Sequence, residues 1–231
     1  IPSGKSQPKR LKSATSKGKE DEMMQRGMGR FVLAAVCALA VATTGAFAAQ
    51  KKLKEIEIGK KAPAFKLKGV DGKMYSLADT LKKNKAVVVT FTCNACPVAV
   101  AYEERIKQLQ ADYKDKKVAV LAINSNDPKV VARDSFEHMK VRAKEKKFNF
   151  PYVFDATQEV AKAYGARVTP HIFLVDSKGV VAYRGAIDDN RNPKNAKAHY
   201  LRAAIDATLA GKKVEKNSTK AFGCTIKWSK K

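Results

Sequence analysis

The sequence predicts an α/β fold: a central mixed β-sheet with helices on both faces, extended by an N-terminal β-hairpin. Short apolar runs rich in β-branched residues alternate with segments of helical spacing, which favours strand–helix–strand units. Two further apolar runs near the C-terminus are joined by a short polar turn, which favours an antiparallel pair. The sheet should therefore contain both parallel and antiparallel strands.

Turn residues and hydrophobic periodicity predict the first half of the fold. Asp71-Gly72 is typical of a tight turn between two strands. The run from Ala86 to Phe91 is apolar and β-branched, as expected of a strand buried on both faces, and apolar side chains recur at helical spacing after Pro97. The predicted elements are a hairpin over 67–77, strands over 86–91 and 118–123, and helices over 97–113 and 130–147.

The second half is predicted in the same way. Gly165 is suited to end a short helix, and Ser177-Lys178-Gly179 form a turn between two apolar runs. The predicted elements are a strand over 152–154, a helix over 158–164, a hairpin made from 169–176 and 180–184, and a helix over 196–209.

The N-terminal fifth of the chain does not have the pattern of a folded domain. Residues 1–22 are polar and lysine-rich and lack an initiating Met, which suggests an extension that is not translated. Residues 23–49 predict a secretory signal peptide, because a positive residue precedes a short apolar stretch and small residues mark cleavage near Ala48 or Ala49. The apolar stretch is shorter than the roughly 20 residues of a membrane span. Residues 50–231 then form one domain, without a stable membrane span once the signal is cleaved.

The chain is strongly basic, with a formal net charge of +24. The lysines are spread over nearly every predicted helix and loop, as in Lys144-Glu145-Lys146-Lys147, and no arginine-rich stripe with interleaved aromatics occurs. This distribution argues against nucleic-acid binding. It indicates a solvated cationic surface, with attraction to anionic partners or a membrane face as a milder alternative.

The segment Cys93-Asn94-Ala95-Cys96-Pro97 places two cysteines between the predicted strand at 86–91 and the helix at 97–113. Unpaired backbone N–H groups and the helix dipole favour a thiolate there. Cysteines three residues apart in a first helical turn can also form a disulfide locally. We therefore expect a redox pair with Cys93 as the nucleophile. A structural disulfide and half of a zinc site are the alternatives, although His138, His171 and His199 stand singly, without zinc-ligand spacing.

The order of elements, the Cys93-x-x-Cys96 pair and Thr169-Pro170 at the start of the final hairpin together resemble the thioredoxin-like superfamily. The closest resemblance is to its redoxin branch, exported thiol-disulfide oxidoreductases related to peroxiredoxins of the AhpC/TSA type. It extends over nearly all of residues 50–231, including the opening motif Gly59-x-x-Ala62-Pro63-x-Phe65-x-Leu67.

The resemblance implies a thioredoxin-like fold with a cis peptide bond before Pro170. Thr169 and Pro170 would shape a substrate groove, with the Thr169 backbone free to pair with a substrate strand. Many thioredoxins carry a buried acid six residues before the first cysteine, where this chain has Val87. Glu103 and Glu104 on the predicted helix are candidates for the proton-transfer role instead.

Two other functions compete with disulfide exchange. Thr90-Phe91-Thr92-Cys93 contains the Thr-x-x-Cys of a peroxiredoxin, which suggests a thiol peroxidase that uses Cys93, but Ala86 stands where that motif has proline. A copper-binding chaperone would use Cys93, Cys96 and a histidine, although the cysteines of related copper chaperones are spaced by three residues.

Cys224, in Gly223-Cys224-Thr225-Ile226-Lys227-Trp228, is a possible third redox cysteine. The ending resembles that of some redoxin proteins with a Cys-Asn-x-Cys-Pro site, and a small buried residue in a terminal strand is the alternative. Cys224 could relay electrons to the pair or link to a partner.

The sequence thus predicts an exported, periplasmic or extracellular thiol-disulfide oxidoreductase. Cys93 attacks, Cys96 resolves, and no cofactor or metal is implied. The expected partners are protein thiols and disulfides together with a membrane or exported electron donor.

Overall fold

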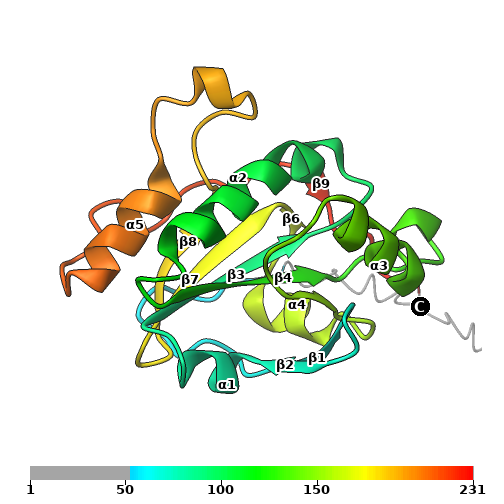
Figure 1. Ribbon diagram of the computed structural model, residues 1–231, viewed down its shortest axis with the longest axis horizontal. Coiled ribbons are helices and arrows are strands. Elements are labelled where there is room, and N and C mark those ends of the chain that lie inside the picture. The colour runs from blue at the N-terminus through cyan, green and yellow to red at the C-terminus, as the bar shows by residue number, and fades with distance from the viewer. Residues whose placement is uncertain (1–52, 231) are drawn as a thin grey trace, which may run out of the picture. The chain divides into compact units, whose positions relative to one another are not determined.

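The computed structural model describes residues 53–230, which are built around a seven-stranded mixed sheet (Figure 1). The strand order is β2-β1-β5-β4-β3-β7-β8. Strands β3, β4 and β5 are mutually parallel, and every other neighbouring pair is antiparallel. The strands are β1 (Lys66–Gly69), β2 (Met74–Ser76), β3 (Ala86–Thr92), β4 (Val118–Asn124), β5 (Tyr152–Phe154), β7 (His171–Asp176) and β8 (Val181–Gly185). The predicted mixed sheet and its N-terminal hairpin, β1 with β2, are confirmed.

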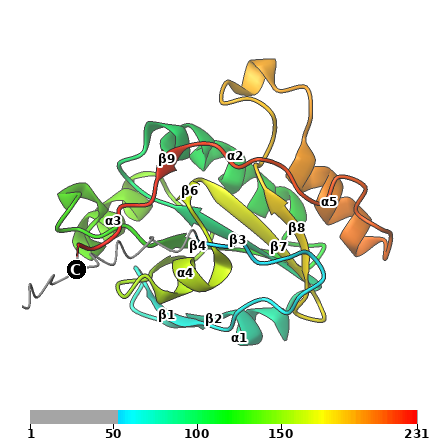
Figure 2. The ribbon, with the colours of Figure 1, turned by 180° about the vertical axis from the view of Figure 1, so that it is seen from behind.

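Helices cover both faces of the sheet (Figures 1 and 2). One apolar cluster joins the sheet to α2, α3 and α5, and a second cluster joins the opposite face to α1 and α4. The helices are α1 (Leu77–Leu81), α2 (Pro97–Tyr113), α3 (Phe136–Glu145), α4 (Glu159–Tyr164) and α5 (Tyr200–Leu209), with short 3-10 turns η1 (Ala132–Asp134) and η2 (Pro193–Asn195).

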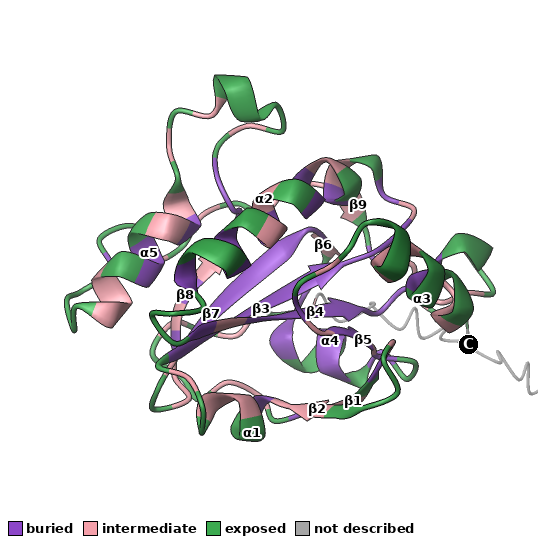
Figure 3. Cartoon of the chain, in the orientation of Figure 1, coloured by how far each residue is buried: buried purple, intermediate pink, exposed green. Residues whose placement is uncertain are grey.

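Strand β3 lies at the centre of the sheet, and all seven of its residues are buried (Figure 3). Its neighbours are β4 on one side and β7 on the other, so that Val88 lies opposite Val120 and Leu174. Because successive strand residues point to opposite faces, Val88 joins one core cluster while Val87 and Val89 join the other. This double burial explains the continuous apolar run in the sequence.

The helices differ from the prediction at three places. The helix expected over 130–147 is divided into η1 and α3, because Ser135 is extended and its hydroxyl caps α3 at the His138 N–H. The helix expected over 196–209 begins only at Tyr200. The short helix α1 was not predicted, although Ser76 caps it through the Asp79 N–H.

The predicted extension at 1–22, the signal peptide at 23–49 and the cleavage site near Ala48 or Ala49 lie outside the described residues. Between residues 53 and 230, no helix is long and apolar enough to cross a membrane.

Phe173 on β7 tests the importance of the second core cluster. Its ring is fully buried and packs edge-on against Phe91 and Tyr164, with centroids 5.8 and 5.2 Å away. Replacement by alanine should lower the free energy of unfolding by about 3–5 kcal/mol, as expected when a buried aromatic ring is removed. Urea denaturation measures the change. Val141→Ala, at a side chain with 53 % exposure, is the control and should change stability by less than about 0.5 kcal/mol. Similar losses of stability in both variants would show that the Phe173 ring does not stabilise the second core cluster.

Candidate active site

The two cysteines of the motif lie between the end of β3 and the start of α2. Cys96 is the N-cap residue of α2, and Pro97 occupies the first helical position, where its missing N–H is tolerated. Cys93 and Cys96 are only 2 % and 4 % exposed, and with Ala99 they form a small apolar cluster of their own. Helix α2 thus begins directly after Cys96, and both cysteine side chains are shielded from water.

The sulfur of Cys96 has more polar neighbours than that of Cys93. Its Sγ accepts hydrogen bonds from the backbone N–H groups of Ala99 and Cys224, both at 3.4 Å. When protonated, it donates to the Thr169 carbonyl oxygen at 3.2 Å. Cys93 Sγ lies 3.4 Å from the Thr169 hydroxyl. Backbone N–H donors therefore stabilise negative charge mainly at Cys96.

This arrangement favours a thiolate on Cys96, whereas the sequence predicted Cys93 as the nucleophile. The hydrogen bond from the Cys93 thiol lowers the pKa of Cys96 to about 4, and contacts with Cys224 and the Ala99 N–H act in the same direction. The same bond raises the pKa of Cys93, as do burial and the nearby charge of Asp134. In the reduced pair, negative charge is therefore favoured on Cys96 and the proton on Cys93.

Thr169 and Pro170 lie beside the pair, and the peptide bond between them is cis, as the resemblance implied. The Thr169 backbone, however, is not free. Strand β6 (Val168–Thr169) pairs antiparallel with β9 (Cys224–Thr225), which places Thr169 opposite Cys224. Since β9 belongs to the C-terminal segment of the same chain, the expectation of an open backbone edge at Thr169 is wrong.

Asp134, a buried acid that the sequence did not single out, accepts hydrogen bonds from the backbone of the Cys93–Cys96 motif. Asp134, at the end of η1, is fully buried. Its Oδ1 accepts the backbone N–H groups of Asn94 and Ala95 at 2.7 and 3.1 Å, and Oδ2 accepts the Asn126 amide at 2.8 Å. Because β4 is parallel to β3, the loops after both strands meet at one edge of the sheet. Parallel pairing therefore places the loop after β4 near the motif, but nothing in the sequence distinguishes Asp134 from the other residues of that loop.

The acids considered earlier have other partners. Glu103 is buried and forms a bidentate ion pair with Arg142, one bond of which measures 2.9 Å. Glu104 is exposed and pairs with Lys107 on the same helix. Val87, at the position where many thioredoxins have an acid, packs in the core. Asp134 is therefore the acid that touches the Cys93–Cys96 segment.

The histidines do not complete a metal site with the cysteines. His171 is buried against Phe173, and burial lowers its pKa to about 4. Its Nδ1 accepts the Arg167 N–H at 3.4 Å. His138 is hydrogen-bonded to Ser135 on α3. Within residues 53–230, no three His, Cys, Asp or Glu side chains are grouped so as to hold a metal ion, and the copper hypothesis gains no support from this geometry.

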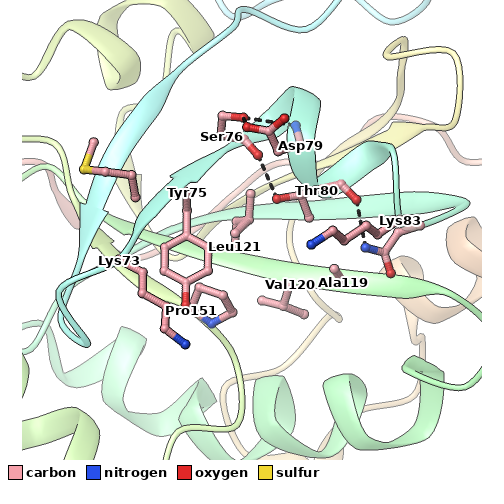
Figure 4. Close-up of a pocket in the computed structure, with 12 residues that line it drawn as sticks. Lys73, Tyr75, Ser76, Asp79, Thr80, Lys83, Ala119, Val120, Leu121 and Pro151 are labelled. Carbon is pink, nitrogen blue, oxygen red and sulfur yellow. Dashed lines mark hydrogen bonds between the residues drawn. The ribbon is translucent and has the colours of Figure 1, made fainter.

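A separate surface pocket of about 410 Å³ lies between β2, α1 and the edge of β4 (Figure 4). Lys73, Tyr75, Lys83, Leu121 and Pro151 are among the residues around it. None of the candidate site residues lines this pocket, so the dithiol chemistry does not depend on it.

A mixed sheet flanked by helices, a Cys-x-x-Cys pair at the start of a helix and a cis-proline beside it define a thioredoxin-like protein. The sequence model of the Redoxin family matches residues 57–200, and the chain belongs to this family.

Three relatives extend the comparison. The thiol-disulfide oxidoreductase ResA of Bacillus thuringiensis subsp. konkukian is 29 % identical over 133 residues, which cover 56 % of this chain and 70 % of ResA. An uncharacterised protein from Geobacillus kaustophilus is 41 % identical with a TM-score of 0.72, covering 76 % of this chain and 94 % of that one. A candidate thiol:disulfide interchange protein DsbE from Chlorobium tepidum is 26 % identical with a TM-score of 0.54, covering 67 % and 99 %. The chain is a thiol-disulfide oxidoreductase, as predicted.

Asp134→Asn tests the electrostatic effect of the buried carboxylate. The charge of Asp134 raises the pKa of Cys93, so its removal should lower that pKa and make the pair more oxidising. The pH dependence of cysteine alkylation and the equilibrium with glutathione measure both changes. Asp115→Asn, at an exposed residue, is the control. A Cys93 pKa that rises, or a potential that shifts equally in the control, would rule out this role.

Gly223→Ala tests the close approach of β9 to Thr169. A Cβ at Gly223, where φ is +155°, would lie 2.0 Å from the Thr169 carbonyl oxygen. Gly211 also has positive φ but open space around it, so Gly211→Ala should cost about 1–2 kcal/mol from backbone strain alone. Gly223→Ala should cost about 1–3 kcal/mol more, as expected for overpacking. Chemical denaturation compares the two variants, and equal losses would show that β9 moves aside without cost.

Proposed function

We propose that Cys93 and Cys96 are the redox couple of this enzyme and exchange a dithiol for a disulfide with protein substrates. The observation that carries the proposal is the buried pair of cysteines at the start of α2, with two backbone N–H groups directed at Cys96 Sγ. A stabilised thiolate next to a protonated thiol is the state from which disulfide exchange proceeds.

The exchange can be written with atoms and electrons balanced. Cys93 transfers its proton to the neighbouring Cys96 thiolate and attacks one sulfur of a substrate disulfide. The substrate's other sulfur leaves as a thiolate, and the new Cys96 S–H can donate to the Thr169 carbonyl. That proton then passes to the departed thiolate. Cys96 attacks Cys93 Sγ, and the second substrate thiolate leaves. Two electrons pass from the pair to the substrate, and the reverse sequence oxidises a substrate dithiol.

Residues around the pair have supporting roles in this proposal. The Thr169 hydroxyl lies 3.4 Å from Cys93 Sγ, where it can hydrogen-bond to a developing thiolate. Asp134 holds the backbone between the cysteines through Asn94 and Ala95, which keeps the two sulfurs close. Pro170 contributes no N–H at this point of the site.

Export belongs to the same proposal. Residues 23–49 have the pattern of a signal peptide cleaved near Ala48 or Ala49, and residues 50–231 would then form a single redoxin domain. An exported dithiol must be maintained in an oxidising compartment, which calls for a membrane-bound or exported electron donor.

Peroxide reduction is a second candidate. The Thr90 hydroxyl is fully buried, three residues before Cys93, and has no hydrogen-bond partner among residues 53–230. A peroxidase would use Cys93 as its peroxide-attacking thiolate, but Cys96 packs directly beside Cys93, where it can resolve a mixed disulfide. Disulfide exchange is therefore the better match.

The reduction potential of the Cys93/Cys96 pair tests the proposal. Alkylation mass shifts across a glutathione or dithiothreitol series should reveal one reversible two-electron couple that disappears in Cys93→Ser and Cys96→Ser. A value near about −270 mV would indicate a reductant, and one near about −120 mV an oxidant. Because the pKa of Cys96 is lowered, its alkylation should persist below pH 7 and fall only as the pH drops through that lowered pKa. Peroxide consumption without any reversible disulfide would favour the second candidate instead.

A further inference from the structure

The C-terminal strand β9 occupies the edge at which a substrate peptide would add a strand. Figure 2 shows β9 beside β6, and the register places Cys224 opposite Thr169. Peptides bind exposed sheet edges by antiparallel or parallel pairing of this kind. The chain has therefore placed one of its own cysteines next to the redox pair, where a substrate cysteine would otherwise lie.

The segment around β9 is firmly attached on its C-terminal side. Ile226 is buried in the core, and its N–H donates to the Arg167 carbonyl at 2.9 Å. The Lys227 N–H donates to the Asn126 side chain at 2.8 Å, and the Lys227 carbonyl accepts the Gln158 amide at 2.8 Å. With this many anchors, β9 is a built-in part of the site.

Its N-terminal side is fixed by close packing. Phe222 packs edge-on against Tyr102 of α2, with ring centroids 6.0 Å apart. Gly223 follows directly and leaves room for the Thr169 carbonyl oxygen, which the added Cβ of any other residue would meet. These contacts hold Cys224 over the start of α2.

Three cysteines therefore converge, with Cys96 in contact with both of the others. The Cys224 N–H lies 3.4 Å from Cys96 Sγ, and the Cys224 side chain packs against the cluster of Cys93, Cys96 and Ala99. Cys93 and Cys96 are buried, whereas Cys224 is partly exposed. Of the three, Cys224 is the one that a large partner can reach with β9 in place.

We infer that Cys224 is a third redox cysteine, which forms a disulfide with Cys96 and passes electrons between the buried pair and the disulfides of protein partners. The inference rests on the proposed function, because the buried pair remains the electron store. It adds a route by which a protein partner reacts at the surface, while small disulfides can react at Cys93.

Each step of this relay is a thiol-disulfide exchange. The Cys224 thiolate, after losing its proton to solvent, attacks a partner disulfide and releases one partner thiolate. The Cys96 thiolate then attacks Cys224 Sγ, forms the Cys96–Cys224 disulfide and releases the second partner thiolate. Cys93 attacks Cys96 Sγ and forms the Cys93–Cys96 disulfide, Cys224 leaves as a thiolate, and the proton released by Cys93 passes to it and restores the Cys224 thiol. Two electrons pass from the pair to the partner, and no other reactant is needed.

The charge distribution suits the second step of the relay. The hydrogen bond from Cys93 lowers the pKa of Cys96, which favours Cys96 as the thiolate that attacks Cys224. Burial raises the pKa of Cys224, and so does the hydrogen bond to Cys96, so Cys224 must lose its proton to solvent before the first step. In the reverse direction, attack of an external thiolate on Cys224 expels Cys96, which is a good leaving group because its thiolate is stabilised.

Trapping the intermediate disulfide tests the inference. In the full chain with Cys37→Ser, so that only these three cysteines can react, Cys93→Ser leaves Cys96 with Cys224, and Cys96→Ser leaves Cys93 with Cys224. Under an oxidising glutathione buffer, Cys93→Ser should form the intramolecular Cys96–Cys224 disulfide, identified by peptide mass mapping. It should do so at least tenfold faster than Cys96→Ser forms a Cys93–Cys224 bond. Equal rates, or no Cys96–Cys224 bond, would overturn the inference. If Cys93→Ser does not fold, mapping of the parent protein at partial oxidation gives the same answer.

A second variant separates the relay from the redox pair itself. Cys224→Ser should retain a reversible Cys93–Cys96 couple with glutathione but reduce insulin disulfides at least tenfold more slowly. Thr225→Ser, in the same strand, should match the parent protein. Insulin reduction at the parent rate, or faster, in Cys224→Ser would show that Cys224 is not a relay. Loss of the reversible couple in the parent protein would instead refute the proposed function on which the relay rests.

Discussion

The register of β3 against its two neighbours is the constraint on which the site depends. β3 is buried on both faces, and Cys93 follows directly after its last residue, Thr92. Because β4 is parallel to β3, the loop that carries Asp134 reaches the same edge of the sheet. Because β7 is antiparallel, it begins at that edge, which brings the cis Thr169–Pro170 bond to the sulfurs. Shifting β3 by one residue would turn its core side chains to the wrong faces and separate these groups.

The electrostatics of the pair follow from which backbone groups face which sulfur. A helix N-terminus stabilises an anion only where its free N–H groups point, and here the Ala99 N–H points at Cys96. The N–H groups of Asn94 and Ala95, which could have stabilised a charge nearer Cys93, are bound to Asp134. The backbone donors thus stabilise negative charge at Cys96 more than at Cys93.

Because both cysteines of the dithiol are buried, the partly exposed Cys224 beside them matters for how a protein partner reaches the pair. A redox pair that exchanges with proteins must be reached by another sulfur, yet both motif cysteines are buried, and Cys224 of the C-terminal segment packs against their cluster. The hydrogen bonds of Ile226 and Lys227 oppose displacement of β9. Cys224 already lies on that strand, so it can pass electrons between a partner and the buried pair without displacing β9. The same segment that closes the site therefore also supplies a way into it.

The sequence by itself determined the order of strands and helices, the continuous burial of β3 and the Cys93-x-x-Cys96 pair at the start of α2, because periodicity, turn residues and motif spacing are local signals. It also pointed to the cis-proline and to Cys224 through the resemblance, without placing Cys224. Only the tertiary structure decided that Asp134 supports the motif, that Thr169 is paired with Cys224, and that the Cys224 N–H faces the Cys96 sulfur. Those facts depend on contacts between residues 39 to 128 positions apart, which the packing of the sheet creates and no local pattern encodes.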